Sequence, residues 1–365
     1  MRISLRLSMY LGRSFLFAYL AAISVLAGLT FFKDLVSYGR DAADKSDLTF
    51  DVVLEMAALL VPMSIEKMTP LALLAGGMVT MWRLTRNNEL VAVRAAGISV
   101  WQFLAPAVMV AVLAGAFILG LVNPLGSVGL VRHNVLYSTH INSKDRVFKV
   151  SSVGVWLREV DEDGATVIHA DRATSVDGVS LSQATAILFD ADGTFQVRID
   201  AESATLGDGR WRFADAVMKR PKGRDEPHEF IDLKTGLTAA RIQDSVAEPE
   251  AISFWRLPEV IKLTEGAGFT AVRYRIHWNA LLASPLLFCA MMLLAATFSL
   301  RAPRRGGTMK LITAGILAGF CVELLKYVMV TLGNFGQIPV MLAAWTPAVA
   351  ASMFAIAALF HVEDG

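Results

Sequence analysis

Residues 83–99, RLTRNNELVAVRAAGIS, carry the charged side chains whose types and spacing most directly suggest a function. Gly97 offers a helix stop, and Ser99 with Gln102 forms a capping box that starts the next helix. The pattern predicts a short helix over about 83–97. On this helix Glu89 lies on the flank of one face, and that face carries Arg83, Arg86, Asn87, Arg94 and Gly97.

This segment has two interpretations. Its arginines could anchor two membrane helices, with the polar face in solvent. The same helix could instead dock on a cytoplasmic motor protein.

A second pair of charges, Glu323 and Lys326, stands three residues apart inside an apolar stretch. Charged residues within a membrane helix are candidates for function, and an ion pair inside one helix is the alternative.

Enzyme chemistry has little support in the chain. The motifs GxxxxGK[ST], HExxH, GxSxG and CxxC are missing, and the six histidines lack the spacing of metal ligands. We therefore predict no catalytic residue, no metal and no cofactor. Nucleotide-driven work would require another subunit.

Composition indicates a membrane protein. Of 365 residues, 55% are hydrophobic and only 18% are charged. The net charge of +1 gives no case for nucleic acid, and Cys289 and Cys321 form no disulfide framework.

The apolar residues fall into six stretches, each long enough to cross a bilayer as a helix. These predicted spans are 14–32, 65–84, 100–122, 277–300, 311–332 and 338–361. The shorter stretch 52–62 predicts an interfacial or re-entrant helix before the second span. Ten lysines and arginines flank the spans on one side, which predicts that both termini are cytoplasmic.

The polar block 126–272 alternates apolar and polar residues, and four Asp-Gly pairs recur within it. Alternation predicts strands, and Asp-Gly supplies the positive φ angles of hairpin turns. We predict an antiparallel sandwich, jelly roll or open barrel on the outer side, followed by an interfacial helix near 254–268. The predicted domains are 1–125, 126–272 and 273–365.

Five motifs mark the chain in a fixed order: FFKDLVSYGRD, VPMSIEKMTPLALLAG, NNELVAVRAAGIS, SPLLFCAMMLLAATFSLR and FGQIPVMLAAWTP. Together they resemble the permease subunits of the lipopolysaccharide transport (Lpt) ABC exporter, the YjgP/YjgQ family. The first and fourth motifs favour LptG over LptF. The resemblance implies a six-span permease of the bacterial inner membrane with a periplasmic jelly-roll-like domain.

The implied partners are an LptB-like cytoplasmic ATPase dimer, an LptF-like sister permease and a single-span LptC-like protein. The implied cargo is lipopolysaccharide, taken from the outer leaflet of the inner membrane.

The resemblance assigns coupling to the ATPase to the segment from Arg83 to Gly97. Glu89 could pair with an arginine of the ATPase, and removing one partner of such a buried pair costs roughly 2–5 kcal/mol. Pairing with Arg86 in the same helix is the alternative, worth only a few tenths of a kcal/mol.

The substrate end is expected at the outer ends of the spans. Lys33, Lys67 and Arg132 could meet lipid A phosphates, or could simply extend their charges to the membrane surface. Apolar side chains of the first and fifth spans would line a lipid-sized cavity, namely Phe31, Phe32, Leu325 and Met329.

Two rival functions remain. An ion-driven secondary transporter predicts charges near the bilayer midplane in several spans and internal repeats, and here only Glu323 and Lys326 lie near the middle of a span. A sensor or scaffold would bind a ligand in the outer domain and need no cavity.

Overall fold

The computed structural model describes residues 5–43, 49–140, 148–151, 154–161, 164–174, 180–190, 193–207, 209–221, 223–236, 248–266, 270–300 and 308–363. The chain divides into two compact units. The membrane unit comprises Met1–Ile141, Ser253–Trp255 and Arg275–Gly365, and the β unit comprises Asn142–Ile252 and Arg256–Tyr274.

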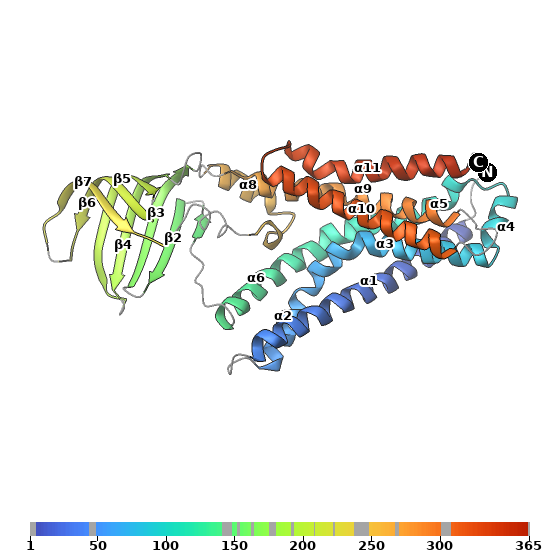
Figure 1. Cartoon of the computed structure of the whole chain (residues 1–365), viewed down its shortest axis with the longest axis horizontal. Coiled ribbons are helices and arrows are strands. Elements are labelled where there is room, and N and C mark those ends of the chain that lie inside the picture. Colours follow the sequence, from blue (N-terminus) through green and yellow to red (C-terminus); the bar gives the residue numbers. More distant parts are fainter. Residues whose placement is uncertain are drawn as a thin grey trace. The chain divides into compact units, whose positions relative to one another are not determined.

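Long apolar helices build the membrane unit (Figure 1). Among the described residues, five helices are long and apolar enough to cross a membrane, and a bent helix pair makes up to six. The helices are α1 (Leu5–Ala43), α2 (Phe50–Leu59), α3 (Val61–Arg86), α4 (Glu89–Ala95), α5 (Val100–Phe117), α6 (Asn123–His140), α9 (Val272–Leu300), α10 (Thr308–Asn334) and α11 (Val340–Glu363). The predicted membrane fold is confirmed, and the bend of 42° between α2 and α3 agrees with a short helix before the second span.

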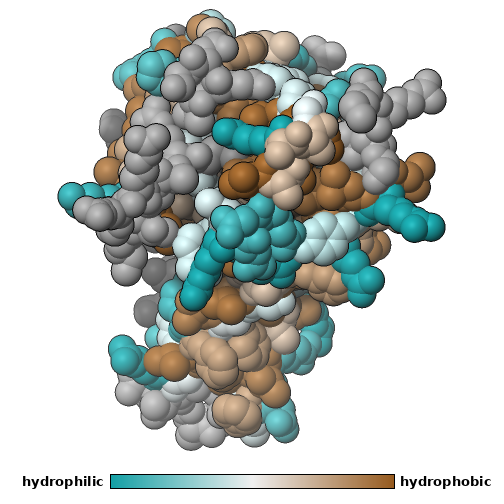
Figure 2. All heavy atoms as spheres, turned by 90° about the vertical axis from the view of Figure 1, so that its right-hand side faces the viewer, coloured by the Kyte–Doolittle hydropathy of each residue, from teal (hydrophilic) through white to brown (hydrophobic). Residues whose placement is uncertain are grey.

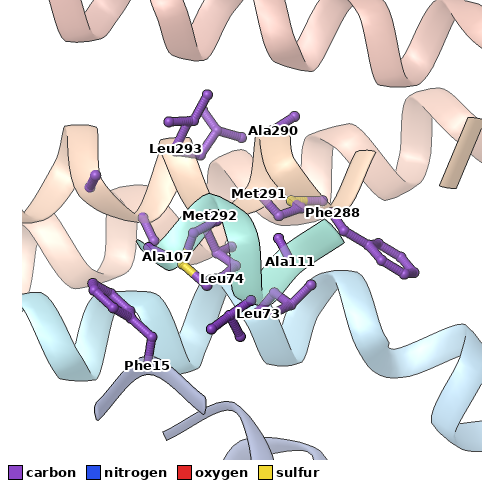
Figure 3. Packing of buried hydrophobic residues seen from close by; sticks show 14 of the residues in the cluster. Phe15, Leu73, Leu74, Ala107, Ala111, Phe288, Ala290, Met291, Met292 and Leu293 are labelled. Atoms are coloured by element: carbon purple, nitrogen blue, oxygen red, sulfur yellow. The ribbon is translucent and has the colours of Figure 1, made fainter. Parts of the chain in front are cut away.

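Helix α9 forms the centre of this unit. Of its most apolar stretch 67% is buried, against 22% for α1 and 11% for α10. Met291 and Met292 of α9 pack in one cluster with Leu73 and Leu74 of α3, and Phe15 of α1 closes the same cluster (Figure 3). Most of the apolar surface of α1 and α10 is therefore left for lipid, ligand or a partner.

Two adjacent glycines let two helices approach α3 closely. A Cβ atom on Gly76 would lie 2.8 Å from the backbone nitrogen of Tyr19 in α1, and one on Gly77 would lie 2.7 Å from the Cβ of Ala295 in α9. Membrane helices lack a hydrophobic force between them, so close contact through small residues supplies their association.

The third span is much longer than predicted. A short π-helical segment (Ile118–Val122) joins α5 to α6, and together they form one helix of 41 residues from Val100 to His140. The boundary predicted at 126 is wrong, because α6 packs its polar and small residues inside the bundle. Asn123, Ser127 and His133 are all buried there.

The β unit is an antiparallel sheet in the middle of the chain, as predicted. Its seven described strands follow one another in the order β1 to β7. They are β1 (Phe148–Ser151), β2 (Gly154–Asp161), β3 (Gly164–Thr174), β4 (Ser180–Asp190), β5 (Phe195–Gly207), β6 (Arg210–Lys219) and β7 (Glu226–Lys234). This sequential order differs from the crossing connections of a jelly roll. The Asp-Gly pairs fall in the four connections from β2 to β6.

The alternation of buried and exposed side chains shifts by one residue along a line across the sheet, which we call the crease. In β6 the buried positions run 211, 213 and then 216, so one step of three replaces a step of two. Gln183 and Asp215 lie on the crease with φ angles of 52° and 50°. The neighbouring strands keep their pairing register on both sides of these two residues. The carboxylate of Glu159 in β2 accepts hydrogen bonds from Thr235 and Gly236, just beyond β7. The sheet is therefore curled, with its second and last strands brought together around the buried Trp211 and Phe213.

The exposed face of the sheet carries a charged cluster around Asp200. Burial raises the pKa of this carboxyl, but hydrogen bonds from Arg198, Thr185 and Lys219 outweigh that effect and hold the pKa below its ordinary value. After the sheet, helix α8 (Leu257–Gly266) matches the helix predicted near 254–268.

Candidate functional site

The segment between α3 and α5 is folded as two pieces instead of one helix. Helix α3 ends at Arg86, and Asn88 adopts the left-handed conformation with φ of 58° before α4 begins at Glu89. The predicted continuous helix over 83–97 is therefore wrong, because asparagine readily leaves the helix for this conformation. Arg83 and Arg86 belong to the second span, whereas Glu89 and Arg94 belong to α4.

The end of α4 forms as predicted at Gly97. The Gly97 N–H donates to the carbonyl of Arg94, and the Ile98 N–H donates to that of Val93. With φ of 78° at Gly97, this is the left-handed helix stop that glycine favours. Ser99 then accepts a hydrogen bond from the backbone nitrogen of Gln102 at 3.3 Å, which confirms the predicted cap of α5.

The carboxylate of Glu89 is held by two neutral groups. The Tyr10 hydroxyl of α1 donates to Glu89 Oε2 at 2.9 Å, and Asn87 Nδ2 donates to Oε1 at 3.3 Å. No ion pair joins Glu89 to Arg86 in the described part of the chain, since the Arg86 guanidinium lies 5.3 Å from the centre of the Trp82 ring. The Tyr10 hydroxyl also interacts with the Arg83 side chain, so Glu89, Tyr10 and Arg83 form one polar cluster.

Helix α4 has one buried face and one open face. Leu90 is buried, and Val93 and Ile98 pack against the same core. Val91 on the opposite face is 62% exposed, and Arg94 is also exposed. Viewed from the end that carries α4, the surface mixes hydrophilic and hydrophobic side chains (Figure 2).

The start of α1 is part of the same surface. Arg83 Nη2 donates to the hydroxyl of Ser14 at 2.5 Å, beside the contact of Tyr10 with Glu89. Sequence reasoning missed Tyr10, Ser14 and Trp82, because each is recruited from another turn or another helix. The Asn87–Asn88 pair was the available signal for the break.

At the other end of the membrane unit, two of the three predicted phosphate ligands are paired with acids. Lys33 Nζ lies 2.9 Å from Asp34 Oδ1, and Arg132 Nε lies 3.3 Å from Glu55 Oε1. Lys67 is exposed on α3. An anion at Lys33 or Arg132 would have to compete with a carboxylate already in place.

The apolar candidates lie on the two least buried helices. Phe31 and Phe32 of α1 are in edge-to-face contact with ring centres 5.8 Å apart, and Phe32 is 63% exposed. Leu325 and Met329 are half-buried on α10. Helices α1 and α10 both pack against α3.

The charged pair within α10 forms the predicted intrahelical contact. Lys326 Nζ lies 3.3 Å from Glu323 Oε2. The second carboxylate oxygen, Oε1, is buried without a hydrogen-bond partner among the described residues.

Comparison with known proteins gives one result for nearly the whole chain. The model of the family described as "Lipopolysaccharide export system permease LptF/LptG" matches residues 9–361. No curated protein matches the sequence.

Proposed function

Because the chain belongs to the LptF/LptG family of lipopolysaccharide export permeases, we propose that it is the LptG-type permease subunit of an ABC exporter. A sister LptF-like permease would complete the channel, and an LptB-like ATPase dimer would drive it. The several membrane-spanning helices agree with a multi-pass protein of the inner membrane. The starts of α1 and α5, the end of α11 and α4 share one end of the unit (Figure 1), which would be the cytoplasmic end.

Helix α4 carries this proposal. It is a capped helix at the cytoplasmic end with a carboxylate oriented by Tyr10 and Asn87, and with apolar Val91 exposed beside Arg94. An arginine in a groove of the ATPase would pair with Glu89. Closure of the ATPase dimer on nucleotide would then move α4 together with the adjoining end of α3.

The substrate would enter between the exposed faces of α1 and α10 of this chain and those of the sister permease. Low burial of both helices supports this assignment, since Phe32 and its neighbours present an apolar surface suited to acyl chains. Lys67 is the phosphate ligand best supported by its surroundings, because Lys33 and Arg132 already face acids. A single-span LptC-like helix would bind beside these spans, and the curled sheet would receive the acyl chains on its apolar face.

Two experiments test the proposal. Purification of the tagged protein in mild detergent, followed by mass spectrometry, is expected to recover an ATPase, a second permease and a lipid A-containing glycolipid. Proteoliposomes of that complex are expected to release lipopolysaccharide on addition of ATP. Recovery of the chain alone, or with phospholipid only, would contradict the proposal.

An ion-driven transporter is the second candidate, and the Glu323–Lys326 pair favours it. That function predicts that ionophores abolish transport while removal of ATP does not. The exporter predicts the reverse.

A further inference from the structure

Asn123 stands at the junction of three segments of the membrane unit. The side chain is buried, with 4% exposure. Its Nδ2 donates to Glu66 Oε2 of α3 at 3.0 Å, and its Oδ1 accepts from the backbone nitrogen of Phe254 at 2.7 Å. One amide thus binds α3 on one side and the segment Ser253–Trp255 on the other.

Local sequence explains why Asn123 lies at this point. Pro124 lacks an N–H, so it cannot continue the regular hydrogen-bond ladder of the long helix. The preceding residues widen into the π turn Ile118–Val122, and the Asn123 N–H donates to the carbonyl of Ile118, five residues back. The wider turn places the first residue of α6 against Glu66 of α3.

The segment Ser253–Trp255 is where the chain returns to the membrane unit. Residues on both sides of it belong to the β unit, yet these three belong to the membrane unit. Phe254 stacks on Trp278 of α9 with ring centres 6.5 Å apart. The Asn123 amide and this ring contact therefore hold the return segment on the helices.

Helix α3 reaches from this junction to the cytoplasmic end. Glu66 lies near its start, and the helix ends at Arg86, next to α4. The separation along the axis is about 30 Å, at about 1.5 Å per residue. A displacement imposed at α4 would reach Glu66 through this helix, which contains Pro70.

We propose that Asn123 is a positioning residue for transport, which links the return segment Ser253–Trp255 to α3 so that a movement of α3 also moves this segment. This inference rests on the proposed function. Coupling of this kind requires an element with two conformations. The π turn can supply them, because moving its extra residue along the helix would rotate Asn123 away from Glu66 by about 100°.

Exchanging the donor and the acceptor of the hydrogen bond between Asn123 and Glu66 tests whether this bond links α6 to α3. Asn123→Asp places two carboxylates together and breaks the contact with Glu66, while its carboxylate still accepts from Phe254. Glu66→Gln alone keeps an acceptor for Asn123. In the double variant, the amide introduced on α3 donates to the carboxylate introduced at the start of α6, which restores the link.

Transport is measured as lipopolysaccharide released per ATP hydrolysed in proteoliposomes. Asn123→Asp is expected to lower this ratio about fivefold or more, the effect of one lost hydrogen bond, with ATPase activity and assembly retained. The double variant is expected to recover the wild-type ratio. An unchanged ratio in Asn123→Asp, or a double variant no better than it, would overturn the inference. If Asn123→Asp does not assemble, Asn123→Ser removes both contacts without the charge repulsion and is expected to show the same loss.

A distance measurement decides the question even if no transport is found. Spin labels at Lys67→Cys and Trp255→Cys, with Cys289 and Cys321 replaced by alanine, report the separation of α3 and the return segment in nanodiscs. Both label sites are exposed. The distance distribution is expected to be narrow in the parent chain, broad in Asn123→Asp and narrow again in the double variant. Equal widths in all three would refute the link. Failure of the wild-type complex to release lipopolysaccharide would instead refute the proposed function.

Discussion

Replacement of Glu89 by alanine is expected to uncouple this chain from the proposed ATPase. In the structure the carboxylate accepts hydrogen bonds from Tyr10 and Asn87 and has no cation of its own among the described residues. Glu89 is half-buried at the end of the unit where α4 lies.

The magnitude follows from what each variant removes. Loss of one partner of a buried interfacial ion pair costs about 2–5 kcal/mol. Even the lower value weakens binding of the ATPase about 30-fold. Glu89→Gln keeps an oxygen to accept from Tyr10 but removes the charge, so its effect is expected to approach that of alanine. Tyr10→Phe removes only an orienting hydrogen bond, worth about 0.5–1.5 kcal/mol, or about 2- to 13-fold in affinity.

The assay is binding of the purified ATPase to nanodiscs that hold the permease pair, with ATPase stimulation as a second readout. Glu55→Ala is the matched control, because it also removes one carboxylate but lies beside Arg132 at the opposite end of the unit. Glu89→Ala binding as tightly as the control would refute the reasoning. If Tyr10→Phe weakened binding while Glu89→Gln did not, the shape of this surface would matter and its charge would not.

Three further outcomes are expected. Gly97→Ala places a side chain at φ of 78°, which costs about 1–2 kcal/mol, and hydrogen exchange across α4 should rise accordingly. Gly76→Ala forces its Cβ to within 2.8 Å of Tyr19 and should lower the melting temperature in detergent, whereas Gly28→Ala, with nothing within 4 Å, should not. Because the pKa of Asp200 is lowered in the folded state, its stabilising contribution is present at neutral pH and is lost as the pH falls below about 4 and through the folded pKa. The protection factors of the β5 amides, which correct for the intrinsic pH dependence of exchange, should therefore fall in acid in the wild type. In Asp200→Asn they should be lower at pH 7 and change less with pH.

Local patterns in the sequence were sufficient to predict the membrane spans, the strands and the hairpin turns. Each apolar run of about 20 residues predicts a span, because the bilayer leaves the helix as the way to satisfy backbone groups within one segment. Alternation and Asp-Gly pairs likewise predict strands and hairpins, since side chains alternate across a sheet and these turns need positive φ. The stop at Gly97 and the cap at Ser99 were predictable for the same reason: both depend on neighbours within a few residues.

Side-chain partners and the end of the third span could not be predicted from local sequence patterns, because they depend on contacts between residues far apart in the chain. Glu89 meets Tyr10, which is 79 positions away, so its partner could not be inferred from helix spacing around Glu89. The polar residues of α6 suggested that the third span ends near residue 122. In the structure Asn123 and His133 are buried, and the helix continues to His140. The positive φ angles of Gln183 and Asp215 at the crease are likewise not predicted by an alternation with a period of two.

The sequence by itself thus determined which segments cross the membrane and which form strands, because hydrophobic periodicity is a local property. Only the tertiary structure decided how the charges of the described residues are paired and which polar groups join separate helices. Those outcomes depend on hydrogen bonds and packing between residues far apart in the chain, such as Asn123 with Glu66 and Phe254.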